Sequence, residues 1–322
     1  MPSAAPPPPK RALWRSLVRG AFGVAGVVVL VLLVRSAGKE ALLEALEPAL
    51  PWLPALLALD ALRIACDAHA TVLAYGPSGA AIPRLRMLRA QLVANAVTYI
   101  APAGRTAAEA TKAAMLAEFT SWPEATAAAA LMQSLALFGG AVISIPCVIA
   151  SALVLGITDK ITIFIFAQAI GVAASGFAVR FAARSRGITD FLGRRFQKAR
   201  EGADDFHRRS QGGSLVPLAP LASVSVGRAF QVAQYAILAH AVGVDVTLGR
   251  ALLAQGVNMV ALAVGVLVPG QLGATDGAFA LAAEALHTTM PRALAIALLA
   301  HVLQVIWIVI GSITPTVWRV KR

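Results

Sequence analysis

The sequence predicts an all-α protein that crosses a membrane several times. Hydrophobic residues make up 58% of its 322 residues and charged residues only 14%, whereas a typical soluble domain has about 25% charged residues. Long apolar runs recur from residue 17 to residue 314. The runs are continuous and do not alternate with polar residues, which indicates helices and argues against the strands of a membrane barrel.

Full spans and shorter re-entrant hairpins are predicted from the lengths of these runs, about six spans and two hairpins in all, or up to about eight membrane helices. The predicted spans are residues 17–35, 51–75, 124–155, 161–182, 214–242 and 291–314. Basic residues gather before the first span, at 84–89, at 180–209 and at the C-terminus. Because basic loops stay in the cytoplasm, we expect both termini to be cytoplasmic, in the inner (plasma) membrane of a bacterium.

The first hairpin is predicted at residues 90–119, with its tip at APAGR (101–105). Charge and parity require this segment to leave the cytoplasmic side and return to it. Its two arms, 90–101 and 106–119, are shorter than the roughly 20 residues that a full span requires. A hairpin that enters the membrane and turns back fits these lengths.

The second hairpin is predicted at residues 250–289, around VPGQLGATDG (268–277). Here parity allows either a hairpin or two crossings, and the short returning arm, 277–289, favours the hairpin. Irregular backbone at membrane depth is tolerated only where it is buried in protein or lines a watery cavity. We therefore expect the two hairpin tips to face one shared cavity.

The two halves of the chain, residues 17–155 and 156–322, resemble each other after a proline-rich basic tail at 1–16. Each half has a Pro-x-x-Pro segment with an arginine, Arg63 or Arg228, eleven or twelve residues after its first proline. An odd number of crossings in each half places the halves in opposite orientations. Such inverted repeats are typical of secondary transporters.

Charged residues inside the apolar runs are the candidate site residues, because intramembrane charges are rare without a role. Asp60, Arg63 and Asp67 share one helical face, either as a structural ion-pair set or as part of a substrate path. Arg105 at the first tip suits a lipid phosphate, or it pairs with Glu109. Glu109 ends a T-x-x-E pattern, which predicts a capping box at a helix start, and a role in the path is equally open.

The second half offers a matching set. Arg228 heads a polar stripe that also contains two glutamines and a tyrosine. Asp276 is expected to cap a helix that starts at Gly277, to pair with an arginine of either stripe or a lipid amine, or to carry a proton. Gly270, Gly273 and Gly277 are expected to permit close backbone approach, and the amides of the helix start form an anion site.

Several other features point to structure or exclude a function class. Lys112 is expected to pair with Glu109, one helical turn away. The segment 183–213 predicts a cytoplasmic amphipathic helix or a plain basic loop. The histidines at 69, 240, 287 and 301 lack metal-ligand spacing, and no nucleotide-binding glycine motif is present. We therefore expect no metal or cofactor and, without a folded basic surface, no nucleic-acid partner.

Two motifs resemble those of a known family. PAGRTAAEATKAAM (102–115) and VPGQLGATDGAFAL (268–281) are similar to P-G-R-x-G-E and P-G-x-x-G-x-R-E-G of the transmembrane, flippase-like domain of lysylphosphatidylglycerol synthases. Here Ala108 replaces a glycine, Thr275 stands where an arginine is usual, and Asp276 replaces a glutamate. The soluble aminoacyl-transfer domain of those synthases has no counterpart in this sequence, so the resemblance implies lipid translocation and not lipid aminoacylation.

The predicted function is therefore an inner-membrane lipid flippase or transporter that is not an enzyme. A phospholipid head group, anionic or aminoacylated, would pass between the two hairpin tips. One alternative is a membrane-embedded transferase on a lipid-linked substrate, with Glu109 or Asp276 as general base. Another is an accessory subunit of a lipid-modifying complex. A homo-oligomer is compatible with each of these hypotheses.

Overall fold

The computed structural model describes residues 31–32, 34–35, 39–101, 103–187, 197–266 and 268–318. The predicted tail at 1–16, most of the predicted first span and the middle of the predicted amphipathic segment lie outside these residues. Every regular element within them is a helix, which confirms the all-α prediction for the described part of the chain.

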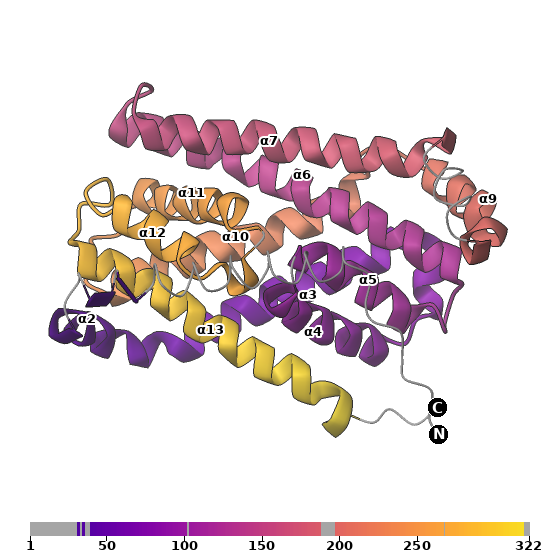
Figure 1. Ribbon diagram of the computed structural model, residues 1–322, viewed down its shortest axis with the longest axis horizontal. Coiled ribbons are helices and arrows are strands. Elements are labelled where there is room, and N and C mark those ends of the chain that lie inside the picture. Colours follow the sequence, from indigo (N-terminus) through magenta and orange to yellow (C-terminus); the bar gives the residue numbers. More distant parts are fainter. Residues whose placement is uncertain are drawn as a thin grey trace, which may run out of the picture.

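The helices follow one another with short connections (Figure 1). In chain order they are α2 (Lys39–Leu46), η1 (Glu47–Trp52), α3 (Leu53–Ala74), η2 (Gly76–Ala81), α4 (Arg84–Ile100), α5 (Gly104–Leu116), α6 (Trp122–Leu155), α7 (Lys160–Arg184), α9 (Gln197–Gln211), α10 (Leu218–Ala241), α11 (Leu248–Val264), η3 (Pro269–Gln271), α12 (Ala274–Leu281) and α13 (Met290–Val317).

Four helical stretches in the described residues are long and apolar enough to cross a membrane: Lys39–Ala74, Trp122–Leu155, Lys160–Arg184 and Met290–Val317. They contain four of the predicted spans and make this a multi-pass membrane protein. The predicted span at 214–242 is the 24-residue helix α10, which is not among the four. Its polar stripe lowers its hydropathy, so the number of crossings stays a prediction.

The helices form an elongated bundle (Figure 1). α6 and α7 pack against each other along one long side, and α13 runs along the opposite side. Between them, α3 packs extensively against α10, so that a helix of the first half meets a helix of the second in the middle of the bundle.

Two short helical pairs occupy the positions of the predicted hairpins. α4 and α5 have 17 and 13 residues, and α11 and α12 have 17 and 8, all below the roughly 20 residues of a full span. α4 begins earlier than predicted, because residues 84–89 form its first turns and not a loop. α4 also contacts η3, the tip of the second pair. The two pairs therefore meet, while their depth in a membrane stays a prediction.

Two glycines permit close packing around the first hairpin. A Cβ atom at Gly104 would lie 1.8 Å from the carbonyl oxygen of Thr98, so only glycine lets the chain turn back against α4. At Gly311 of α13 a Cβ atom would lie 2.5 Å from the carbonyl oxygen of Leu92. This close approach presses α13 onto α4.

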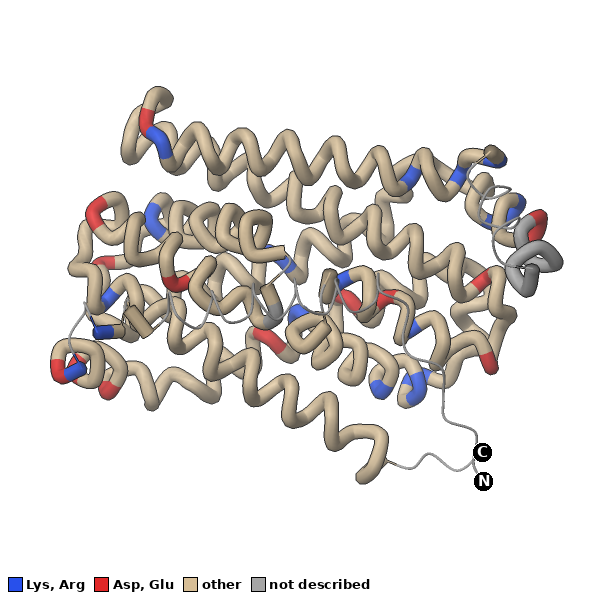
Figure 2. Tube along the Cα trace, in the orientation of Figure 1, with Lys and Arg blue, Asp and Glu red and all other residues tan. Residues whose placement is uncertain are grey.

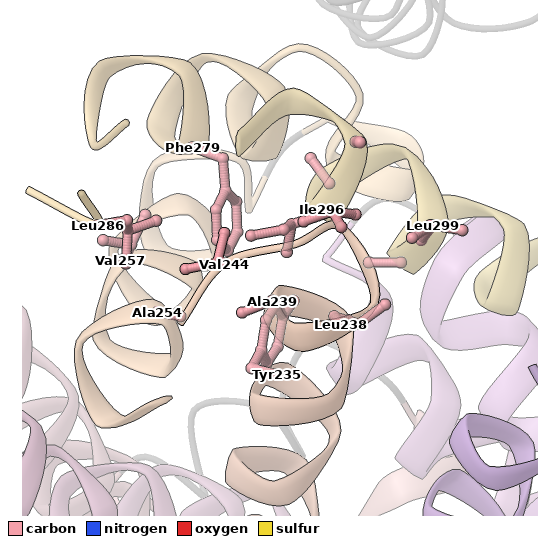
Figure 3. Packing of buried hydrophobic residues seen from close by; sticks show 14 of the residues in the cluster. Tyr235, Leu238, Ala239, Val244, Ala254, Val257, Phe279, Leu286, Ile296 and Leu299 are labelled. Carbon is pink, nitrogen blue, oxygen red and sulfur yellow. The ribbon is translucent and has the colours of Figure 1, made fainter. Parts of the chain in front are cut away.

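The second hairpin is held by an apolar cluster between α10, α11, α12 and α13 (Figure 3). Phe279 is fully buried there and stacks on Tyr235, with ring centroids 5.7 Å apart and an interplanar angle of 11°. A buried aromatic side chain contributes both apolar area and ring contact. The cluster therefore fixes the short helix α12 although that helix has only 8 residues.

α9 is fastened to the end of the bundle by arginines. Arg184 donates to the carbonyl oxygens of Ser210 and Gly213 at 3.0 and 2.7 Å, and Arg180 donates to that of Ser214 at 3.0 Å. Cationic side chains on the last carbonyls of a helix satisfy acceptors that the helix leaves open. The part of the predicted amphipathic segment that the structure describes is thus a helix clamped to α7.

Candidate functional site

A row of ion pairs begins on α3, in the middle of the bundle, where Figure 2 shows charged residues away from both ends. Arg63 Nε lies 2.9 Å from Asp60 Oδ1, and Arg63 Nη1 lies 3.8 Å from Asp67 Oδ2. The ion pairs expected from the spacing of these three residues are therefore present, and their role in a substrate path stays a prediction. Asp60 and Asp67 are both buried, each 6% exposed.

The row continues onto α5 through Arg105. Its Nη1 lies 3.1 Å from Asp67 Oδ2 and its Nε lies 3.2 Å from Glu109 Oε1. Lys112 Nζ then lies 2.9 Å from Glu109 Oε2, as predicted, and donates to Gln91 Oε1 at 3.1 Å. Arg105 therefore joins the first tip to α3.

The predicted capping box at Glu109 is wrong. α5 begins at Gly104, with Ala103 in the left-handed region as its N-cap and no side-chain cap. Glu109 lies in the second turn of the helix, too far along to reach the open amides of the first turn. Its carboxylate pairs with Arg105 and Lys112 instead.

The second half contributes to the same region from α10. Gln234 Nε2 donates to Asp60 Oδ2 at 3.1 Å, and Arg228 Nη1 donates to Gln231 Oε1 at 2.9 Å. Arg228 is half-buried, and no carboxylate of the described residues forms an ion pair with it. The polar stripe predicted on this helix therefore faces the charges of α3 but leaves its arginine without an acid.

We refer to Asp60, Arg63, Asp67, Arg105, Glu109, Lys112 and Arg228 as the central charge cluster. Its four cations and three carboxylates leave one positive charge in excess. Two buried donors at its edge, Arg105 Nη2 and Asn95 Nδ2, have no hydrogen-bond partner. Buried charge is costly unless it is paired, so the cluster as it stands is short of one anion.

Asp276 lies apart from this cluster, at the start of α12. Its Oδ2 accepts from the Gly273 amide at 2.8 Å and lies 3.1 Å from His301 Nε2 on α13. Asp276 is fully buried and pairs with neither Arg63 nor Arg228. The predicted pairing with an arginine is therefore wrong for this conformation.

The predicted helix start is also corrected. α12 begins at Ala274 and not at Gly277, so the amide of Gly277 lies inside the helix and does not open it. The Gly273 amide, which precedes the helix, donates to Asp276. Gly270 and Gly273 have φ values of 63° and 78°, which glycine adopts at low cost. At Gly277, by contrast, nothing lies within 4 Å of an added Cβ atom, so close approach does not explain this glycine.

Sequence reasoning missed several partners of these residues. Gln91 and Asn95 lie one turn apart on α4 and bond to Lys112 and Arg63. His301 was set aside because no second histidine lies at ligand spacing. The sequence could have singled out His301 by its position, because it is a polar side chain within an 18-residue segment of mean hydropathy 2.5.

An apolar groove lies between α6, α10 and α11. It has a volume of about 500 Å³ and is lined by Ile143, Ala229, Val232, Ala233, Ala236, Val246, Thr247, Leu248, Ala251 and Leu252. Ala229 follows Arg228 directly, and Val232 lies one helical turn after it. The groove therefore adjoins the side of α10 that carries the unpaired arginine.

A family model described as the lysylphosphatidylglycerol synthase TM region matches residues 17–311. The chain belongs to this family. Comparisons with curated proteins and with solved structures found no match. In this member of the lysylphosphatidylglycerol synthase TM family, each of the two motif segments that carried the resemblance covers the turn between two short helices and the helix that follows, α5 in the first and α12 in the second. The protein is therefore a membrane protein of a lipid-related family.

Proposed function

We propose that the protein is an inner-membrane lipid transporter that moves a phospholipid head group between leaflets, between the tips of its two hairpins. The observation that carries this proposal is the unpaired positive charge of the central charge cluster. A cation without a counter-ion at the middle of a membrane bundle is costly, and the lipid phosphate is the anion that every phospholipid supplies.

Arg228 is the residue that we assign to the phosphate. A guanidinium can hold two phosphate oxygens at once, and among the described residues Arg228 bonds through Nη1 to a neutral glutamine and to no carboxylate. The free Nη2 of Arg105 and the free Nδ2 of Asn95 are further donors at the edge of the same cluster. Asp60, Arg63, Asp67 and the other paired charges of the cluster would hold these donors in place.

The neighbouring groove supports a lipid and not a free anion as the substrate. Its lining is almost wholly apolar and its volume of about 500 Å³ is in the usual range of small-molecule sites. A lipid could rest an acyl chain there while its phosphate reaches Arg228. A water-soluble anion would gain nothing from this surface.

The second hairpin would be the moving part opposite the first. Gly270, Gly273, Asp276 and Gly277 belong to its tip and initial helix, which contacts α13 and, through η3, α4. Two hairpins in oppositely oriented halves would open the path alternately to the two leaflets. The end of the bundle that carries α9 and the start of α4 would face the cytoplasm, because it carries the basic residues.

Lipid exchange in proteoliposomes tests this function. The purified chain is reconstituted with fluorescent phosphatidylglycerol or with an aminoacylated analogue, and quencher-accessible signal is followed. We expect exchange in the wild type and a loss of roughly tenfold or more in Arg228→Ala, equal to about 1.4 kcal/mol. Arg292→Ala is the matched control, since Arg292 is exposed and bonds only the Gly243 carbonyl. Exchange that is absent from the wild type, or equal in Arg228→Ala, refutes the proposal.

A membrane-embedded transferase is the second candidate, and the Asp276–His301 pair favours it. A carboxylate that bonds an imidazole is a common arrangement for general-base chemistry. Asp276 is fully buried, however, so an acceptor hydroxyl does not reach it in this conformation. Incubation of the reconstituted protein with labelled phospholipid and a search for a covalently altered lipid decides between the two candidates.

A further inference from the structure

A buried acid–imidazole pair that the proposed lipid path does not use joins the second hairpin to α13. His301 is 8% exposed and Asp276 is fully buried. Their contact joins α12 to α13 across residues 25 positions apart in sequence. Asp276 Oδ1 has no hydrogen-bond partner, so the pair has one free buried acceptor.

Charged and titratable groups on the surrounding helices do not pair with Asp276 or His301. On the described elements that pack around α12 and α13 these groups are Lys39, Glu40, Glu44, Asp60, Arg63, Cys66, Asp67, His69, Arg84, Arg86, Arg89, Tyr99, Arg228, Tyr235, His240, Arg250 and Arg292, together with Glu284 and His287 in the turn after α12. Arg250 and Arg292 bond backbone carbonyls, and the charges of α3 belong to the central charge cluster. The pair is therefore electrostatically its own unit.

The environment of His301 suits both protonation states of its ring. Nε2 donates to Asp276 Oδ2, and Nδ1 faces the Gln304 amide, with Oε1 at 3.2 Å. An amide accepts from a protonated Nδ1 through its oxygen and donates to an unprotonated Nδ1 through its nitrogen after a half-turn. The site can therefore gain or lose one proton without leaving a buried ring nitrogen unbonded.

The same carboxylate oxygen also holds the hairpin tip. Asp276 Oδ2 accepts from the Gly273 amide, directly after a tip in which Gly270, Gln271 and Gly273 all have positive φ values, of 63°, 56° and 78°. A non-glycine residue in this region is held there by its surroundings. A proton added to the carboxylate weakens its bonds to both partners, because a charged acceptor bonds more strongly than a neutral one.

We propose that Asp276 and His301 form a proton-binding site that controls the position of the second hairpin tip. The part of this inference that concerns transport rests on the proposed function: the imidazolium–carboxylate pair holds the tip to α13 more tightly than the pair with a neutral imidazole does, so that lipid translocation would depend on pH. The proton-binding site itself rests on the contacts of Asp276 with His301 and with the Gly273 amide, which do not depend on the proposed function.

Proton binding is measured directly by NMR on protein with isotope-labelled histidine in lipid nanodiscs. The His301 signal is assigned by its loss in His301→Gln. We expect it to titrate in the wild type and to shift its titration by about one pH unit or more in Asp276→Asn, because a paired charge is removed. Glu284→Gln is the matched control, since this exposed carboxylate follows α12 in the same hairpin. A His301 signal that does not titrate, or titrates identically in Asp276→Asn, overturns the proposal.

The dependence of transport on pH is measured with the same proteoliposome exchange assay, with the inner and outer solutions set to the same pH over a series of values. We expect the wild-type rate to change with pH and the control His287→Gln, which alters an exposed histidine of the same hairpin, to keep that response. A wild-type pH response that persists in Asp276→Asn or His301→Gln overturns the coupling. If the wild type translocates no lipid at any pH while the His301 titration still depends on Asp276, the proposed function fails and the proton site stands.

Discussion

Removal of the carboxylate of Glu109 should destabilise the fold strongly. Glu109 is 4% exposed. Its carboxylate forms ion pairs with Arg105 at 3.2 Å and with Lys112 at 2.9 Å, and its Oε1 accepts a hydrogen bond from Lys112 Nζ at 3.1 Å. In Glu109→Gln, Arg105 keeps its ion pair with Asp67. Lys112, which is 3% exposed, loses the one carboxylate that pairs with it among the described residues. Breaking a buried pair from one side costs about 3–5 kcal/mol, because a buried charge is left uncompensated.

The assay is thermal unfolding of the purified protein in detergent, with the double variant Glu109→Gln/Lys112→Met in a mutant cycle. We expect the second substitution to recover a large part of the loss, because it removes the stranded ammonium group. Glu118→Gln is the matched control. Its side chain is 57% exposed and lies 3.7 Å from Arg86, so the change should cost below about 1 kcal/mol.

Two outcomes would refute this reasoning. One is a loss of stability in Glu109→Gln no larger than that in Glu118→Gln, which would mean that the central charge cluster is not buried as described. The other is a double variant that is less stable than Glu109→Gln, which would mean that Lys112 stabilises the fold through Thr71 and Gln91 more than through the carboxylate.

Two further predictions concern the backbone and the end of the bundle. Gly104→Ala should lower the melting temperature clearly, because its Cβ atom would lie 1.8 Å from the Thr98 carbonyl oxygen. In the control Gly277→Ala the added Cβ atom meets nothing within 4 Å, so this change should be neutral or stabilise the fold by up to about 1 kcal/mol. Equal melting temperatures of the two variants would contradict the close turn at the first tip. Arg184→Ala should speed limited proteolysis of the α9–α10 connection. Arg184 donates to the carbonyl oxygens of Gly213 and Ser214 in that connection and to those of Ser210 and Gln211 at the end of α9. Lys160→Ala, an exposed change at the other end of α7, should leave the cleavage rate unaltered.

Contacts within one helix were the predictable part of the site. The spacing of Asp60, Arg63 and Asp67 fixes their distance once the segment is helical, and the same holds for Glu109 and Lys112. The contact between Arg105 and Asp67 joins residues 38 positions apart. Its existence depends on how the first hairpin packs on α3, which no local pattern determines.

Helix starts were the least predictable feature. Both acidic residues of the tips were expected to cap a helix, and only Asp276 does so, from the third position of α12. Glu109 fails because the chain turns already at Ala103 in a left-handed conformation, which the close fit of Gly104 permits. A cap depends on where the tight turn falls, and that turn depends on tertiary contact with α4.

The interface between α3 and α10 contains a natural reporter thiol. The chain has two cysteines, of which Cys147 is fully buried and Cys66 is partly accessible. A Cβ atom at Gly227 would lie 3.2 Å from that of Cys66, and Ser223 donates to the Cys66 carbonyl oxygen at 2.8 Å. Any separation of the two halves must uncover this one sulfur. The alkylation rate of the unmodified protein therefore reports how tightly the halves are closed, without an engineered label.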